Sequence, residues 1–217
     1  MCGNSRGPFY FAELANGWTV GRFVALDELP AVVHAVTTRE GFDVDLAARQ
    51  AGEADGLVTG VSRLGLAGFS ADCPILLAAD PVSGAVGMAH ASWRATAGRI
   101  ASEMIRELVD RFGATPADVV ACIGPSAGPC CYEVGDDLVH AVLAGVGERA
   151  GKFFETRAGK TYFDLWSANA DALGVAGLLP EHVHTAGVCT LCRNDLFPSY
   201  RLEGRRAGRF VAVISKK

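Results

Sequence analysis

The clearest pattern in this chain is the sequence ILLAADPVSGAVGM at residues 75–88. Two short apolar runs flank a segment rich in turn-forming residues, a pattern that predicts a strand, a turn and a second strand. Cys73 stands just before the first run, and His90 follows the second. Because the two outer ends of a hairpin meet, we expect these side chains to share one site. A thiol and an imidazole held together are either soft metal ligands or a nucleophile and its base.

Charged residues accompany both of these side chains. Asp72 directly precedes the cysteine, and Arg94 follows the histidine by one short segment. Taken alone, Cys73 is interpreted as a small buried hydrophobe and His90 as a satisfied core histidine. A carboxylate and a guanidinium beside two ligand-type groups at one sheet edge are hard to explain by packing, so the combination favours a functional site.

The remaining apolar patterns alternate between strand and helix without a regular βαβ order. This mixture predicts an α+β domain with a mostly antiparallel or mixed sheet. No internal repeat or linker interrupts the chain, so we expect a single domain over residues 1–217. Strands are expected at 18–25, 31–37, 57–59, 66–70, 119–123, 182–188 and 209–215, and helices at 97–112, 135–146 and 164–173.

Composition excludes several classes of protein. Half of the 217 residues are hydrophobic, a fifth are charged and the net charge is -4, which gives no basic surface for nucleic acid. No apolar run approaches the length that spans a bilayer, and no signal-peptide hydrophobic region is present. We therefore expect a cytoplasmic protein that binds neither nucleic acid nor membrane.

The seven cysteines are odd in number and are accompanied by no export signal, so we expect reduced thiols rather than a disulfide framework. Cys189 and Cys192 form a C-x-x-C motif, which is either half of a zinc site or a redox pair. The sequence contains no second C-x-x-C motif and no thioredoxin-like unit. Buried thiols at a turn are therefore the simpler interpretation.

A second cluster, IGPSAGPCCYE, occupies residues 123–133. Its glycines permit a tight loop whose N–H groups can face an anion, and Tyr132 can stack on a ring or bond a hydroxyl. A rigid connector that needs glycine and proline is the alternative. Arg39 and Arg201 are suited to bidentate binding of phosphate or carboxylate, although each taken alone is interpreted as a solvated surface residue.

Four segments, in the same order, resemble the laccase-domain family of purine nucleoside phosphorylases, formerly called bacterial polyphenol oxidases. The segments are EADGLVT at 53–59 leading into ADCP at 71–74, AHASWR at 89–94, IGPSAGPCCYEVG at 123–135, and CTLC at 189–192 with SYR at 199–201. The resemblance implies a layered α/β sandwich with mixed β-sheets, similar to the catalytic domain of a deamidating toxin with a cysteine hydrolase fold.

The resemblance also implies a Zn²⁺ site made of two histidines and one cysteine. Cys73 and His90 match the cysteine and the second histidine. The family's first histidine lies in a Gln-Val-His-Gly motif that is missing here, as though a piece upstream of the Glu-Ala-Asp segment were deleted. His34 is the only other histidine before His90, so either it substitutes or two protein ligands remain. In this scheme Arg94 and Arg39 orient an anion.

The implied activity is zinc-dependent purine nucleoside phosphorylase or adenosine deaminase chemistry on adenosine, inosine and related nucleosides, with phosphate as co-substrate. Asp72 and Tyr132 are the expected substrate-binding residues of a monomer or small homo-oligomer. A cysteine hydrolase or deamidase with Cys73 as thiolate and His90 as base is one alternative, and a non-catalytic purine-binding protein is another. A copper phenol oxidase ranks last, because one cysteine and at most two histidines cannot build a multicopper cluster.

Overall fold

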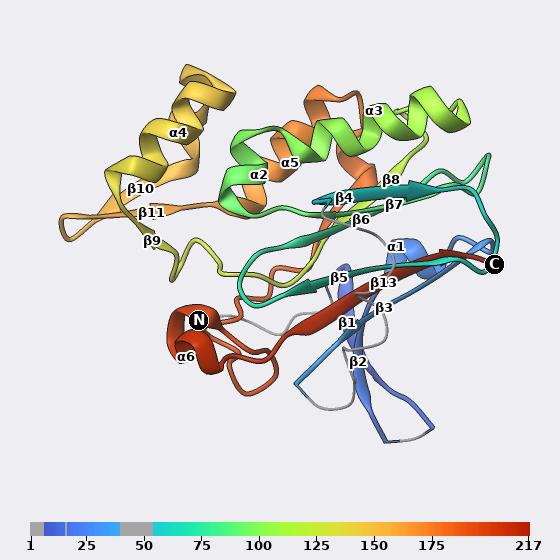
Figure 1. Cartoon of the computed structure of the whole chain (residues 1–217), viewed down its shortest axis with the longest axis horizontal. Coiled ribbons are helices and arrows are strands. Elements are labelled where there is room, and N and C mark those ends of the chain that lie inside the picture. Colours follow the sequence, from blue (N-terminus) through green and yellow to red (C-terminus); the bar gives the residue numbers. More distant parts are fainter. Residues whose placement is uncertain (1–6, 16, 40–53) are drawn as a thin grey trace.

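The computed structural model describes residues 7–15, 17–39 and 54–217. They form two five-stranded sheets and a covering layer of helices (Figure 1). The first sheet contains, in spatial order, β1 (Phe9–Glu13), β2 (Thr19–Phe23), β3 (Val32–Thr37), β13 (Phe210–Lys216) and β5 (Gly65–Ser70). The second contains β12 (Val183–Thr185), β8 (Val120–Ile123), β6 (Ile75–Ala79), β7 (Val86–His90) and β4 (Gly56–Thr59).

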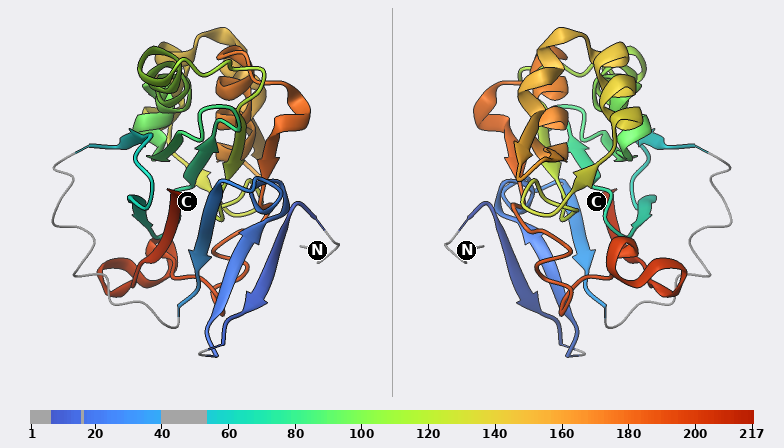
Figure 2. Two further views of the ribbon diagram at one scale, coloured as in Figure 1. Left: turned by 90° about the vertical axis from the view of Figure 1, so that its right-hand side faces the viewer. Right: turned by 90° about the vertical axis from the view of Figure 1, so that its left-hand side faces the viewer.

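Helices cover the second sheet on the face away from the first sheet. In the views of Figure 2, α2 to α5 lie at the opposite end of the molecule from the blue N-terminal strands. The helices are α1 (Val24–Asp27), α2 (Trp93–Ala97), α3 (Ile100–Phe112), α4 (Asp136–Val146), α5 (Leu165–Val175) and α6 (Tyr200–Glu203). A third, small sheet has the order β10 (Phe154–Arg157), β11 (Lys160–Phe163) and β9 (Glu133–Val134). No helix among the described residues is long and apolar enough to cross a membrane.

Strand β6 is covered on both faces, so the second sheet contributes to two hydrophobic cores. Ile75 and Leu77 face the core between the two sheets, whereas Leu76 packs with α3 and α5. All five residues of β6 are fully buried. Because successive side chains in a strand point to opposite faces, a strand covered on both sides must be apolar throughout. The continuous apolar run at 75–79 follows from this position.

The predicted hairpin is confirmed. β6 and β7 pair antiparallel, with Ile75 opposite His90. The second sheet is mixed, because β12 and β8 are parallel while the other strand pairs of this sheet are antiparallel. Mixed sheets and packed helices agree with the predicted α+β class and layered α/β sandwich. The assignment of residues 1–217 to one domain stays a prediction.

The helix predicted at 97–112 is confirmed as α3, which begins three residues later at Ile100, and the short helix α2 before it was not predicted. α2 ends at Ala97, and α3 begins after Arg99, whose φ of 62° is left-handed. A Cβ atom on Gly145 of α4 would lie 2.2 Å from the carbonyl oxygen of Ala97. The end of α2 therefore packs directly on the backbone of α4, and Arg99 Nε donates to the Gly145 carbonyl at 3.1 Å. This contact between distant segments is the physical reason for the break between α2 and α3. β1 and the β10–β11 hairpin were also not predicted.

Candidate functional site

A cavity of about 310 Å³ lies beside the Cys73 turn and the end of β7. Four predicted site residues line it, namely Asp72, Cys73, His90 and Tyr132. The other lining residues are Phe69, Ser70, Ala71, Tyr200, Arg201 and Arg209. The fold therefore brings the cysteine and the histidine to one cavity, as the hairpin predicted.

The turn between β5 and β6 holds Cys73 in place. The Ser70 hydroxyl donates to the Cys73 carbonyl at 2.6 Å, and Asp72 adopts a left-handed φ of 85°. Phe210, the first residue of β13, pairs with Ser70, which brings Arg209 to the cavity. Both sheets thus contribute to the cavity wall.

Asp72 ties the cavity wall together rather than facing substrate with free oxygens. Its carboxylate accepts the Thr190 hydroxyl at 2.6 Å on Oδ1, and the Ser199 hydroxyl at 3.0 Å and the Arg201 backbone N–H at 2.7 Å on Oδ2. Its carbonyl accepts the Ala127 N–H at 2.8 Å. The side chain is buried, so these charge-assisted bonds are strong. Asp72 therefore positions α6 and the 189–192 turn around the cavity.

The thiol of Cys73 is protonated at neutral pH in this environment. Burial, and then the negative charge of Asp72, raise the pKa of Cys73 to about 11, against the opposing charge of Arg209. A thiolate is the nucleophilic form of cysteine, so this environment disfavours the cysteine hydrolase hypothesis. His90 is half-buried, and its Nδ1 lies 3.6 Å from Asp55 Oδ1.

Of the arginines considered from the sequence, only Arg201 lines the cavity, and Arg209 joins it there. The Arg201 guanidinium lies 4.9 Å from the centre of the Tyr132 ring. Arg39 is instead bonded to the Glu203 carboxylate and donates from Nε to the Asn194 carbonyl at 2.7 Å.

Arg94 stacks on the Trp93 ring at 4.1 Å. Neither Arg39 nor Arg94 lines the cavity, so the structure does not bring them to Cys73 and His90, and their role as anion binders stays a prediction. Arg39 instead anchors α6 through Glu203 and so acts indirectly on the cavity wall. Arg209 carried no motif signal, because its place depends on strand pairing.

His34 does not reach the cavity. It is buried in β3, where its Nε2 accepts the Phe23 backbone N–H at 2.7 Å. It pairs with Ile214, four residues along β13 from Phe210, which places it roughly 13 Å along the strand from the cavity. The predicted substitution of His34 for the missing zinc ligand is therefore corrected: its ring nitrogen satisfies the backbone instead.

The zinc site implied by the family needs three protein ligands, and the described residues do not fit it. Cys73 and His90 supply two donors at the cavity. Where the chain is described, the only group of three or more residues that can hold a metal is formed by other cysteines. A catalytic zinc usually has three protein ligands. The expected loss of the upstream histidine motif falls at residues 40–53, outside the described part.

Four cysteines meet elsewhere, at Cys130, Cys131, Cys189 and Cys192, and together they can hold a metal ion. With no second C-x-x-C motif, the sequence favours buried thiols at a turn for Cys189 and Cys192. The partner pair, Cys130 and Cys131, consists of adjacent residues and therefore forms no spaced motif. The signal was present in the CC dipeptide at 130–131.

A larger cavity of about 470 Å³ lies between β4 and α3. Its charged lining includes Glu103, Glu107 and Arg111, and Arg111 Nε donates to the Glu107 carboxylate at 2.5 Å. No cysteine or histidine is among its lining residues. The smaller cavity, which contains both a cysteine and a histidine, is therefore the stronger candidate site.

Comparisons with known proteins agree with these observations. A purine nucleoside phosphorylase, YlmD, from Geobacillus stearothermophilus is 37% identical over 164 residues, which cover 75% of this chain and 60% of the relative. A protein named adenosine deaminase RL5, from an unknown prokaryotic organism, is 34% identical, with coverage of 75% and 62%. The chain thus spans about 60% of the length of these curated relatives.

Solved structures share the fold. YlmD from Geobacillus stearothermophilus superposes with a TM-score of 0.80 at 25% identity, covering 97% of this chain and 100% of that chain. The hypothetical protein YfiH from Bacillus licheniformis superposes with a TM-score of 0.71 at 36% identity, covering 75% and 61%. The mixed α/β architecture is therefore shared, while the predicted resemblance to a deamidating toxin is not confirmed.

The model of the family described as multi-copper polyphenol oxidoreductase laccase matches residues 21–217. This match covers most of the chain and all four segments on which the sequence resemblance was based. The chain belongs to the multi-copper polyphenol oxidoreductase laccase family, which confirms the family predicted from the sequence.

Proposed function

We propose that this protein is a purine nucleoside phosphorylase that acts on inosine, adenosine and related nucleosides. One observation carries the proposal: two guanidinium groups, an imidazole and two tyrosine rings line one cavity. Arginine is suited to phosphate, aromatic rings are suited to a purine, and imidazole is suited to proton transfer. Relatives named purine nucleoside phosphorylase add support.

The dimensions of the cavity support a small-molecule substrate. Its volume of about 310 Å³ lies at the lower end of the range of ligand pockets, roughly 300–1,000 Å³. The aromatic lining consists of Phe69, Tyr132 and Tyr200, which gives a purine ring faces for stacking. Burial raises the pKa of Tyr132 to about 12, so its hydroxyl stays neutral and able to donate to the substrate.

In the proposed reaction, a phosphate oxygen attacks C1′ of the ribose while the bond from C1′ to the purine N9 breaks. Arg201 and Arg209 hold the phosphate and balance its charge. The electrons of the broken bond leave with the base, which accepts a proton from the His90 imidazolium. The products are ribose 1-phosphate and the free purine. Asp55 Oδ1 lies 3.6 Å from His90 Nδ1, a position from which it orients the ring for this transfer.

No step of this scheme is routed through zinc, because the described residues supply only two ligands at the cavity. The scheme also needs no thiolate, which agrees with the raised pKa of Cys73. Deamination of adenosine, suggested by the name of one relative, is a distinct reaction that releases ammonia and retains the glycosidic bond. The two reactions therefore give different products from the same substrate.

The test incubates the purified protein with inosine or adenosine, with and without phosphate, and separates the products by chromatography. Phosphate-dependent release of hypoxanthine or adenine supports the proposal. Arg201→Gln and Arg209→Gln should each raise KM for phosphate at least tenfold, since each removes a charged contact worth about 1.5–3 kcal/mol. Arg106→Gln on the exposed face of α3 is the matched control and should leave KM unchanged.

Three outcomes would overturn the proposal. Inosine formed from adenosine without phosphate would identify a deaminase. Binding of inosine without turnover would indicate a purine-binding protein. Unchanged KM for phosphate in both arginine variants would show that the cavity is not the phosphate site.

A further inference from the structure

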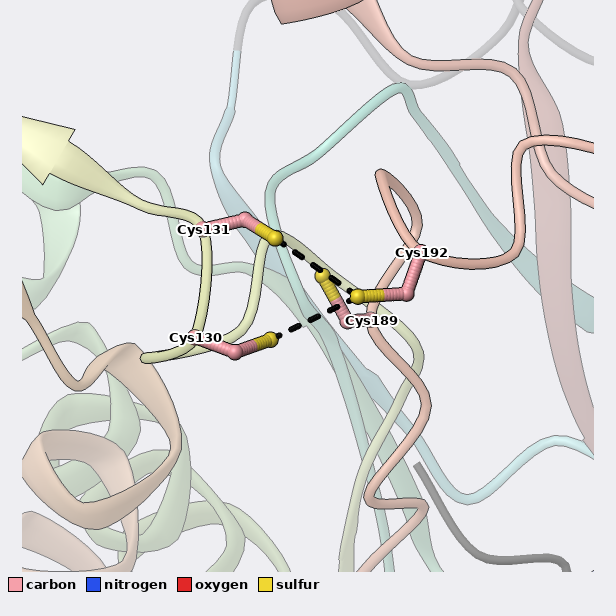
Figure 3. A group of neighbouring side chains, drawn as sticks. All are labelled: Cys130, Cys131, Cys189 and Cys192. Carbon is pink, nitrogen blue, oxygen red and sulfur yellow. Dashed lines mark hydrogen bonds between the residues drawn. The ribbon is translucent and has the colours of Figure 1, made fainter. Parts of the chain in front are cut away.

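A compact group of four cysteines lies apart from the proposed phosphate site. Cys130 and Cys131 belong to the loop after β8, and Cys189 and Cys192 belong to the turn after β12. Figure 3 shows the four sulfur atoms pointing toward a common centre. All four lie within 4.8 Å of one another, and Cys192 Sγ is 3.7 Å from Cys130 Sγ and 3.5 Å from Cys131 Sγ.

We propose that Cys130, Cys131, Cys189 and Cys192 bind one Zn²⁺ ion as a closed, structural four-thiolate site. A tetrahedral zinc with Zn–S bonds of about 2.3 Å places its sulfur atoms about 3.8 Å apart. The contacts of 3.7 and 3.5 Å around Cys192 are close to this edge length. A disulfide instead requires about 2.05 Å between sulfurs. The cluster therefore matches a metal site better than a disulfide.

The loop at residues 126–132 packs closely against Cys189. The Gly128 backbone N–H donates to Cys189 Sγ at 3.3 Å, the kind of contact that stabilises a thiolate ligand. A Cβ atom on Gly128 would lie 2.7 Å from the Trp166 ring and 3.1 Å from Cys189 Cβ, so only glycine allows this approach. Ser126 and Cys189 form a parallel bridge that fixes the two segments side by side.

Four sulfur donors that converge on one point are the ligand set of a closed structural zinc site. Zinc binding releases one proton from each sulfur that is protonated beforehand. Zinc binds more tightly than ferrous iron at such a site, and thiolates are among its preferred ligands.

The proposed site also has a consequence for the cavity. Tyr132, which lines the cavity, directly follows Cys131, and Thr190, which donates to Asp72, lies between the other two cysteines. A zinc ion would lock these two segments together and hold both residues in place. We therefore assign the site a structural role that supports the cavity wall from outside.

The test measures metal content and cobalt absorption of the full chain, purified with a reductant and dialysed against a chelator. The wild type should retain one zinc per chain, and Cys192→Ser should lose it. Cys73→Ser is the matched control, since it removes the cavity thiol and should keep the zinc. Cobalt-loaded wild type should show the intense visible bands of tetrahedral thiolate coordination, and Cys192→Ser should lose them.

These measurements separate the alternatives. A metal-free wild type with four reactive thiols, or a disulfide within the group found by mass spectrometry, would overturn the proposal. Zinc that is lost from Cys73→Ser and kept by Cys192→Ser would place the metal at the cavity instead, which also overturns it. Circular dichroism checks the fold of each variant. If Cys192→Ser does not fold, the cobalt spectrum of the wild type decides, because octahedral or oxygen-bound cobalt lacks these bands.

Discussion

The carboxylate of Asp72 offers the sharpest test of how the cavity is held together. It accepts three hydrogen bonds, from Thr190, Ser199 and the backbone of Arg201. A hydrogen bond to a charged group contributes about 1.5–3 kcal/mol, so three independent bonds would give roughly 4.5–9 kcal/mol. They share one carboxylate and are not independent, so we expect Asp72→Ala to lower the free energy of unfolding by about 4–5 kcal/mol.

The variant Asp72→Asn removes the negative charge of Asp72 but keeps the shape of its side chain. The amide oxygen can take the place of Oδ2 and accept from Ser199 and Arg201, while its NH₂ group donates to the rotated Thr190 hydroxyl. Asparagine also tolerates the left-handed φ of 85°. All three contacts then survive without the charge, which is responsible for about half of their strength. We expect a loss of about 2 kcal/mol.

Urea unfolding followed by tryptophan fluorescence measures the free energy of unfolding of both variants. The KM for nucleoside reports whether the cavity still binds substrate. Asp80→Asn is the control, because Asp80 is equally buried but bonds only within its own turn, to Val82 and Ser83. It should leave KM unchanged, whereas both Asp72 variants should raise it. Equal losses of stability in Asp72→Ala and Asp72→Asn would refute the argument from charge. A loss below about 1 kcal/mol in both would refute the role of Asp72 in holding the wall.

Two further predictions concern stability at acid pH. Burial lowers the pKa of His34 to about 4, whereas the pKa of an unfolded histidine is about 6.5. Between these two pH values the unfolded state binds more protons, so the free energy of unfolding falls by roughly 3 kcal/mol as the pH drops from 6.5 to 4. His34→Gln keeps an acceptor for Phe23 but does not titrate, so urea melts across this range should show a shallower decline; an unchanged slope would contradict the assignment. The hydrogen bond from Arg39 lowers the pKa of Glu203 to about 2, so its contribution is complete above about pH 4.5 and is lost as the pH falls toward 2. Glu203→Gln should flatten this part of the acid-unfolding curve, and an identical curve in the variant would show that the ion pair adds no stability.

Features of this protein that depend on a local sequence pattern could be predicted without the fold. The apolar run and turn at 75–88 predicted a hairpin, and pairing of Ile75 with His90 follows directly from it. Hairpin ends meet whatever surrounds them, so Cys73 and His90 were correctly placed at one cavity. The four family segments were recognised for a similar reason, since each is a short stretch whose residue order is visible without the fold.

Which side chains from distant segments join Cys73 and His90 at the cavity depends on the tertiary structure. Arg209 enters the cavity because β13 pairs with β5, and Arg39 is withdrawn because Glu203 on α6 binds it. His34 points its ring nitrogen at the backbone of β2, a partner that no spacing rule reveals. The four cysteines meet only because the 126–132 loop and the 188–192 turn run side by side. Contacts between segments far apart in the chain are set by sheet order and packing, which leave no periodic signal in the sequence.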